Sequence, residues 1–143
     1  MFHSGIFDQA LSDTGRYFDL DIRDLREAQE AIERGLPFNG FEQLRNILGA
    51  GSGELAAALG IAGTTLARRR KEGQLSPEES ERLLRLARLV EMARVVLSPN
   101  GLSSWFNREH PALAAKPLDC ARNEIAARRL ETLLGRLADG GPA

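Results

Sequence analysis

Residues 55–71 read LAAALGIAGTTLARRRK, and the spacing of three of them decides the fold. Ala56 is small, Gly60 follows four residues later, and Leu66 lies six residues beyond that. A small side chain lets two helices cross closely, a glycine reverses the chain at positive φ, and an apolar side chain anchors the second helix. This spacing predicts a helix-turn-helix whose second helix begins near Thr64 and turns its outer face toward DNA.

The candidate DNA-contacting residues lie in that second helix. Thr64 and Thr65 fall at its start, and Arg68 lies one turn beyond Thr64 on the same face. We expect these three side chains to meet base edges in the major groove, and Arg69 or Lys71 to meet phosphates.

The basic run at residues 68–71, RRRK, has a simpler explanation as well. Cations near the end of a helix complement its macrodipole, and Gly73 ends this helix. We favour DNA because dipole compensation needs only one or two cations, and it would not explain the spacing of Ala56, Gly60 and Leu66.

The net charge of the chain is only −1, so any electrostatic indication of a partner must come from how the charges are distributed along the sequence. Residues 1–34 hold eight acidic residues against four arginines, and they either meet a basic partner or orient the protein by repelling DNA.

Composition and motif searches exclude several classes of function. The chain of 143 residues with 43% hydrophobic residues is long enough for one core or two small ones. It has no apolar run that could span a membrane, and its start, MFHSGIFDQ, lacks the features of a signal peptide, so we expect a cytoplasmic, nucleoid-associated protein. A single Cys120 with only His3 and His110 makes no metal site. No P-loop, dinucleotide fingerprint or Ser-His-Asp order is present, so we expect neither an enzyme nor a cofactor.

Apolar residues recur at three- and four-residue spacing, without the period-two alternation of strands, so the sequence predicts an all-α protein. Its strongest local signal is the capping box Ser76-Pro77-Glu78-Glu79, which begins a long connecting helix ending near Leu97. Residues 1–20 have weak periodicity and form either a loosely docked arm or a short helix. The other expected elements are a helix capped by Asp21 with Ile22, Leu25, Ala28 and Ile32 inward, helices at 41–48, 54–59 (capped by Ser52) and 64–72, a short helix carrying Trp105, a turn opened by Pro117, and a final helix from Asn123 to Gly140 with Ile125, Leu130, Leu133, Leu134 and Leu137 inward.

Two apolar features have alternative explanations. The stripe from Leu83 to Leu97 serves either the core of the chain itself or a homodimer, and two-fold dimers are what helix-turn-helix proteins usually present to palindromic DNA. We therefore expect a homodimer. Trp105 is either an interface anchor or, as we favour, part of the core.

Residues 60–93, GIAGTTLARRRKEGQLSPEESERLLRLARLVEMA, closely resemble the helix-turn-helix and following helix of the Xre-type antitoxins of bacterial RES-Xre toxin-antitoxin pairs. The resemblance extends to IERGLPFNGFEQL at residues 32–44 and, at 103–119 and 130–143, to the toxin-binding domain of the Xre/MbcA/ParS-like family. It implies a helix-turn-helix domain with the connecting helix at 36–100 and a toxin-binding domain at 101–143, and the acidic residues ahead of them predict a separate N-terminal helical arm at 1–35.

The resemblance implies two activities. One is repression of the chain's own operon through operator DNA, and the other is neutralisation of a RES-domain toxin, an ADP-ribosyltransferase-like enzyme that destroys NAD, within a toxin-antitoxin hetero-oligomer. The C-terminal segment would cover the toxin's active site. Carried over to this chain, the contact residues are Leu130, Leu134, Arg136, Leu137, Gly140, Gly141, Pro142 and Ala143. The alternatives are a stand-alone repressor whose C-terminal helices dimerise, and a protein-binding module that no longer reads DNA.

The sequence departs from the family pattern at four positions. Ala62 stands where a capping Ser is usual, and Thr64 where an Arg is usual, so operator affinity is expected to be modest. Ala114 and Ala126 stand where Gly is usual, which predicts an altered backbone on the toxin side.

Overall fold

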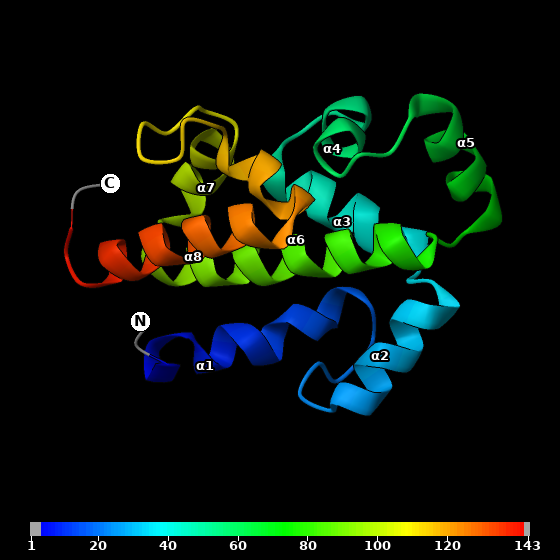
Figure 1. Ribbon diagram of the computed structural model, residues 1–143, viewed down its shortest axis with the longest axis horizontal. Coiled ribbons are helices and arrows are strands. Elements are labelled where there is room, and N and C mark those ends of the chain that lie inside the picture. The colour runs from blue at the N-terminus through cyan, green and yellow to red at the C-terminus, as the bar shows by residue number, and fades with distance from the viewer. Residues whose placement is uncertain (1–3, 142–143) are drawn as a thin grey trace.

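The computed structural model describes residues 4–141, which fold into helices joined by turns (Figure 1). The predicted all-α fold, with a helix-turn-helix domain followed by a long helix and a small helical domain, is confirmed. In chain order the elements are α1 Ser4–Asp13, the 3-10 helix η1 Thr14–Tyr17, α2 Leu25–Arg34, α3 Phe38–Leu48, α4 Ser52–Ala58, α5 Gly63–Glu72, α6 Pro77–Val96, α7 Pro99–Phe106, the 3-10 helix η2 Pro117–Arg122 and α8 Glu124–Ala138.

α6 is the axis of the molecule, and α1 and α8 both run along it (Figure 1). It begins as the sequence predicts, with Ser76 as N-cap and Pro77 in the first turn. The positions of its apolar stripe with no exposed surface are Leu83, Leu86, Ala87, Val90 and Ala93. Of the two predicted roles for this stripe, the structure therefore assigns it to the core of the chain itself.

The buried side chains of the helix-turn-helix domain belong to one continuous core that extends into α6. Phe41, Leu44 and Leu48 of α3 are fully buried, as predicted from their spacing. Leu55 and Leu59 meet them from α4 and its C-terminus, and both have no exposed surface. Complete burial of each such side chain contributes roughly 1.5–3 kcal/mol.

The N-terminal segment packs firmly, so the expectation of a loosely docked arm is wrong, whereas the alternative of a short helix is confirmed. Phe7 of α1 and Tyr17 of η1 are only 3% and 4% exposed. The Tyr17 hydroxyl donates a hydrogen bond to the buried carboxylate of Glu91 in α6, and Arg16 Nη2 lies 3.2 Å from Glu91 Oε1. Burial, followed by the hydrogen bond to Glu91, raises the pKa of Tyr17. A buried carboxylate is stable only with hydrogen-bond donors or positive charges beside it, and here Tyr17 and Arg16 supply them and hold the N-terminal segment against α6.

The helix α2 begins one turn later than predicted. Its N-cap is Asp24, whose side chain accepts a hydrogen bond from Glu27 N–H, rather than Asp21. Leu25 is therefore the first residue of the helix and is 77% exposed, which corrects its predicted inward position. Ala28 and Ala31 form the buried face instead.

Two further expectations differ from the structure, and that for Trp105 is met in part. Gly51 rather than Ser52 is the N-cap of α4. Ile125 lies in the first turn of α8, on the face opposite the buried leucines, and is 68% exposed. Trp105, which we favoured as part of the core, is half-buried and packs against the core, edge-on to the fully buried Phe106 at a centroid distance of 5.6 Å. None of the helices within residues 4–141 combines the length with the hydropathy that a bilayer crossing requires.

Candidate functional site

The helix-turn-helix has the geometry predicted from its three spaced residues. Ala56 and Leu66 are 2% and 5% exposed, which places them between the helices, and Gly60 adopts a φ of 73°. Ile61 N–H donates to Ala56 C=O over 2.8 Å, so the chain reverses tightly around Gly60. Because an L-residue with a side chain is strained at this φ, glycine is favoured at this turn.

The recognition helix, α5, lies at the periphery of the molecule beside α4 (Figure 1). Its N-cap, Ala62, provides no side-chain hydrogen bond, as expected. Thr64, Arg68 and Lys71 are exposed, whereas Thr65 is half-buried. Within residues 4–141, neither Arg68 nor Lys71 forms an ion pair or a side-chain hydrogen bond. These two cations are therefore available to an external anion.

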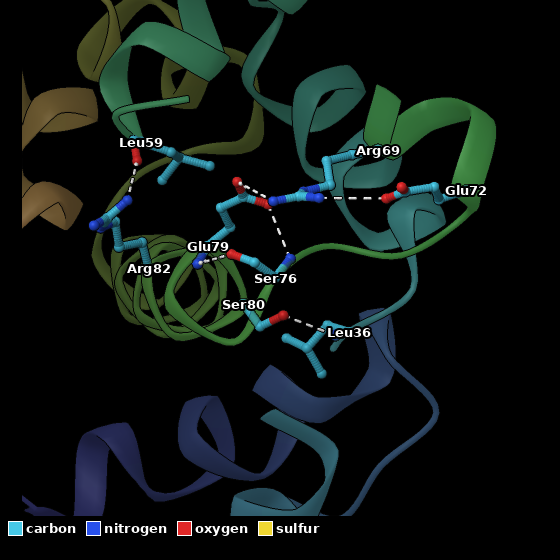
Figure 2. A network of polar contacts seen from close by, with 8 residues as sticks. All are labelled: Leu36, Leu59, Arg69, Glu72, Ser76, Glu79, Ser80 and Arg82. Atoms are coloured by element: carbon cyan, nitrogen blue, oxygen red, sulfur yellow. Dashed lines mark hydrogen bonds and ion pairs between the residues drawn. The ribbon is translucent and has the colours of Figure 1, made fainter. Parts of the chain in front are cut away.

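Arg69 points inward, which corrects its expected position among the phosphate-contacting side chains (Figure 2). Its Nε donates to Glu79 Oε1 over 2.7 Å and its Nη2 to Glu79 Oε2 over 3.3 Å, while Nη1 donates to Glu72 over 3.3 Å. Its side chain is only 18% exposed. The Arg69 guanidinium is thus bound by two carboxylates of the same chain, and it holds α5 against the first turn of α6.

The inward Arg69 fixes the rotation of α5 about its own axis. Successive residues of a helix are about 100° apart, so Lys71 lies roughly 160° from Arg69 and Arg68 about 100° from it. Thr65 is only about 40° from Arg69, which explains its partial burial. Pairing one arginine inward therefore turns Arg68, Lys71 and Thr64 outward.

The fourth cation of the cluster, Arg70, turns toward α3. Its guanidinium carbon lies 5.3 Å from the centre of the Phe38 ring, and Nη2 lies 3.7 Å from Glu42 Oε2. Such a cation-π contact holds an arginine against the protein surface. The run RRRK is therefore divided between two cations that brace α5 and two that face away.

The first turn of α6 contacts α5 through Glu79, which binds Arg69. Ser76 N–H donates to Glu79 Oε1 over 2.9 Å, and Glu79 N–H donates to Ser76 Oγ over 3.2 Å, which completes the predicted capping box. Burial alone would raise the pKa of Glu79, but the hydrogen bonds from Arg69 and from Ser76 N–H outweigh it and hold the pKa below its ordinary value. The Glu79 carboxylate thus caps the N-terminus of α6 and binds α5 through Arg69.

The same part of α6 also fastens the neighbouring turns (Figure 2). Ser80 Oγ, which is fully buried, accepts a hydrogen bond from Leu36 N–H over 2.8 Å. One turn from Glu79, Arg82 Nη1 donates to Leu59 C=O over 3.1 Å. α6 therefore holds both the link into α3 and the turn of the helix-turn-helix.

The residues expected to contact a toxin divide into two groups. Leu130 and Leu134 have no exposed surface because they pack in the core of the chain, so their prediction as surface contacts is corrected. Arg136 and Gly140 are exposed, and Leu137 and Gly141 are half-buried. Pro142 and Ala143 lie outside the described residues.

The exposed members of that set border a hollow of about 530 Å³ at the end of α8. Its wall includes Arg136, Gly140 and Gly141 together with the tight loop at residues 110–112. Arg129 Nη2 donates to Ala112 C=O over 3.0 Å, which joins this loop to α8. The end of α8 and the loop thus form one continuous surface.

Neither metal binding nor thiol chemistry is indicated in the part of the chain that the structure describes. Residues 4–141 contain no group of three or more His, Cys, Asp or Glu side chains placed to hold a metal ion. Burial, followed by the charge of Asp119, raises the pKa of the Cys120 thiol. This cysteine therefore stays protonated near neutral pH and packs as a small apolar residue.

Two family models match the chain. The antitoxin Xre-like helix-turn-helix domain matches residues 27–88, and the antitoxin Xre/MbcA/ParS C-terminal toxin-binding domain matches residues 93–140. The chain belongs to the Xre-type antitoxins. No curated protein matches it.

The two matched regions of this antitoxin meet within α6, since Pro77–Val96 contains the interval between residues 88 and 93. The long helix is therefore shared by the helix-turn-helix and the toxin-binding domain. The boundaries at residues 35 and 100 stay predictions.

Sequence reasoning missed the residues that orient the antitoxin's recognition helix. Glu79 was identified only as a helix cap, and Arg82 was not singled out. The basic run at residues 68–71 contains the partner of Glu79, but the sequence alone does not say which of four cations turns inward.

Replacing Glu79 by glutamine should destabilise the antitoxin at neutral pH by about 1–2 kcal/mol, because the neutral amide leaves the Arg69 guanidinium with only the more exposed Glu72 as a charged partner among the described residues. The folded-state pKa of Glu79 lies below its ordinary value of 4.5, so its stabilisation is present above about that pH and is lost as the pH falls further. Urea unfolding between pH 3 and pH 7 should therefore show a smaller acid-side loss of stability for Glu79→Gln than for the unmodified protein. Glu78→Gln, in the same turn but exposed, is the control, and an equal effect of both substitutions would contradict the assignment.

Replacing Ala114 by glycine should stabilise the antitoxin by up to about 1 kcal/mol, because Ala114 has a φ of 53°, in the left-handed region that favours glycine. Ala114 is exposed, so loss of its methyl group removes no packing. Ala112→Gly, in the same exposed loop but without a positive φ, should instead destabilise. Thermal unfolding of both variants checks the prediction, and a lower melting temperature for Ala114→Gly would contradict it.

Proposed function

We propose that this antitoxin represses its own operon by binding the promoter through α5, and that it neutralises a RES-domain toxin that degrades NAD. The observation that carries the DNA half is the division of the basic run: Arg69 and Arg70 brace the helix, whereas Arg68 and Lys71 are exposed and without ion pairs in residues 4–141. Arg69 and Arg70 already place two positive charges near the C-terminal end of α5. Compensation of the helix dipole therefore does not explain why Arg68 and Lys71 face solvent.

In this proposal the contacts follow from the rotation of α5. Thr64, Arg68 and the exposed part of Thr65 meet base edges in the major groove. Lys71 meets phosphate, and Arg69 contributes by holding the helix rather than by touching DNA. Because neither Ala62 nor Thr64 supplies the side chain usual in the family, we expect modest operator affinity.

The toxin half of the proposal rests on the toxin-binding domain and on the surface at the end of α8. Arg136, Leu137, Gly140 and Gly141, with Pro142 and Ala143 beyond them, would cover the toxin's active site. Leu130 and Leu134 would support that surface from the core. The identity of the toxin as a RES-domain enzyme rests on the sequence resemblance.

The chain would act by binding rather than by catalysis, at the nucleoid, as a homodimer on a palindromic operator and within a larger complex with toxin. The alternative of a stand-alone repressor with dimerising C-terminal helices is less well supported. The buried face of α8 already packs against α6 of the same chain, so it is not free to form a dimer.

Replacing Lys71 by alanine should lower the slope of log affinity against log salt by about 0.9, since one phosphate contact is lost. Arg68→Ala should reduce discrimination between the promoter duplex and a shuffled duplex, at about 1–3 kcal/mol. Fluorescence anisotropy with labelled DNA from directly upstream of the gene measures both. Arg108→Ala is the control, because Arg108 is exposed, follows α7 directly and donates its side-chain hydrogen bond to Ser104 of that neighbouring helix. Promoter binding that neither Arg68 nor Lys71 affects would leave the basic run as a solvated helix end.

Expression of a neighbouring RES-domain gene alone should stop growth and lower cellular NAD, and co-expression of the antitoxin should restore both. The double substitution Arg136→Glu and Leu137→Asp should abolish this rescue while promoter binding remains, because both residues lie at the end of α8, away from the recognition helix. Arg108→Glu, an exposed charge reversal elsewhere in the same domain, should rescue normally. Full rescue by the double variant would contradict the toxin-binding assignment.

A further inference from the structure

Side chains from beyond residue 100 close the C-terminal ends of two helices of the helix-turn-helix domain. The last carbonyls of a helix have no partner within it and need hydrogen bonds from elsewhere. For α3 the donors come from α7 and its C-terminus: Ser103 Oγ donates to Leu48 C=O over 2.7 Å, and Asn107 Nδ2 donates to the same oxygen over 2.9 Å. The toxin-binding domain thus completes a helix of its neighbour.

The donor to α4 is Arg122. Its Nη2 donates to Ala57 C=O over 3.0 Å, from the end of η2, which packs against α4. The underside of η2 is firmly held, because Ala121 is fully buried and Leu118 is 3% exposed. The Arg122 side chain therefore reaches α4 from a fixed position, and within residues 4–141 it forms no ion pair.

Two guanidinium groups meet at the end of α4. Arg122 binds the carbonyl of Ala57, and Arg82 of α6 binds the carbonyl of Leu59, the residue directly before Gly60. Charge-assisted hydrogen bonds of this kind are stronger than neutral ones, and positive charge at a helix C-terminus is favourable. Together they fix the last turn of α4 and the start of the reversal into α5.

This support matters because α4 is short. At seven residues it is below the length at which an isolated helix is stable, so its end is defined by tertiary contacts. The crossing of α4 and α5 depends on where α4 stops, since Gly60 reverses the chain two residues after Ala58. The Ala57 carbonyl also accepts a hydrogen bond from Gly60 N–H over 3.0 Å, so without Arg122 the backbone alone would hold this oxygen and the final turn would fray more readily.

We propose that Arg122 is a positioning residue for operator binding, through which the toxin-binding domain fixes the end of α4 and thereby the placement of α5. The inference rests on the proposed DNA-binding function. Arg122 would act on the recognition helix through the turn, without touching the duplex.

The test compares the full-length protein with Arg122→Ala and with Arg128→Ala. Arg128 is the matched control, because it is an exposed arginine of the same domain whose hydrogen bond goes to Glu124 of its own helix. Anisotropy with the upstream duplex and a shuffled duplex gives affinity, specificity and salt slope. Hydrogen exchange over residues 52–66 reports the turn without DNA.

For Arg122→Ala we expect roughly three- to tenfold weaker binding to the upstream duplex, the effect of one lost hydrogen bond, with an unchanged salt slope. The ratio of upstream to shuffled affinity should fall, which a mere loss of folded protein would not cause because it scales both affinities equally. Amides at residues 59–61 should exchange faster. Arg128→Ala should match the unmodified protein in every measurement.

Other outcomes separate the two proposals. A salt slope lowered by about one would make Arg122 a phosphate contact and overturn its positioning role. Exchange at residues 59–61 equal to that of Arg128→Ala would overturn it too, whatever happens with DNA. If the unmodified protein does not prefer the upstream duplex, the proposed operator binding fails, and the exchange measurement still decides whether Arg122 holds the turn.

Discussion

The pairing of Glu79 with Arg69 is the interaction on which the orientation of the recognition helix depends. A carboxylate as deeply buried as that of Glu79 is tolerated only with donors, and Arg69 supplies two of them while Ser76 N–H supplies a third. Rotating α5 about its axis would break the two bonds from Arg69. The outward direction of Lys71 is therefore a consequence of a contact on the opposite face of the helix.

The fold is organised around α6 rather than around two independent domains. The helix carries the support for α5 in its first turn and the partner of the N-terminal segment, Glu91, near its end. Between them lie the fully buried Leu83, Leu86, Ala87 and Val90, which carry the core from the first matched region toward the second. A continuous helix of this kind keeps the proposed DNA-contacting and toxin-contacting surfaces at a fixed separation.

Features with a local cause were predictable from the sequence, and features with a tertiary cause were not. The capping box at Ser76 and the glycine turn at Gly60 depend on residues a few positions apart, and both were predicted. The inward turn of Arg69 depends on a carboxylate ten residues away, across a turn. Periodicity marked Leu130 and Leu134 as one apolar face, but it cannot tell whether the chain or a partner covers that face, and here the chain does.

The hydrogen bonds that Ser103, Asn107 and Arg122 make to helix ends across the domain boundary limit how such antitoxins can recombine. In a chimera joining this helix-turn-helix to a foreign toxin-binding half, the Leu48 carbonyl would lose its two side-chain donors and the Ala57 carbonyl would keep only backbone bonds, such as that from Gly60 N–H, unless the incoming half carried equivalent donors. Substitutions at the tip of α8, the toxin-contacting surface proposed above, would leave these hydrogen bonds intact.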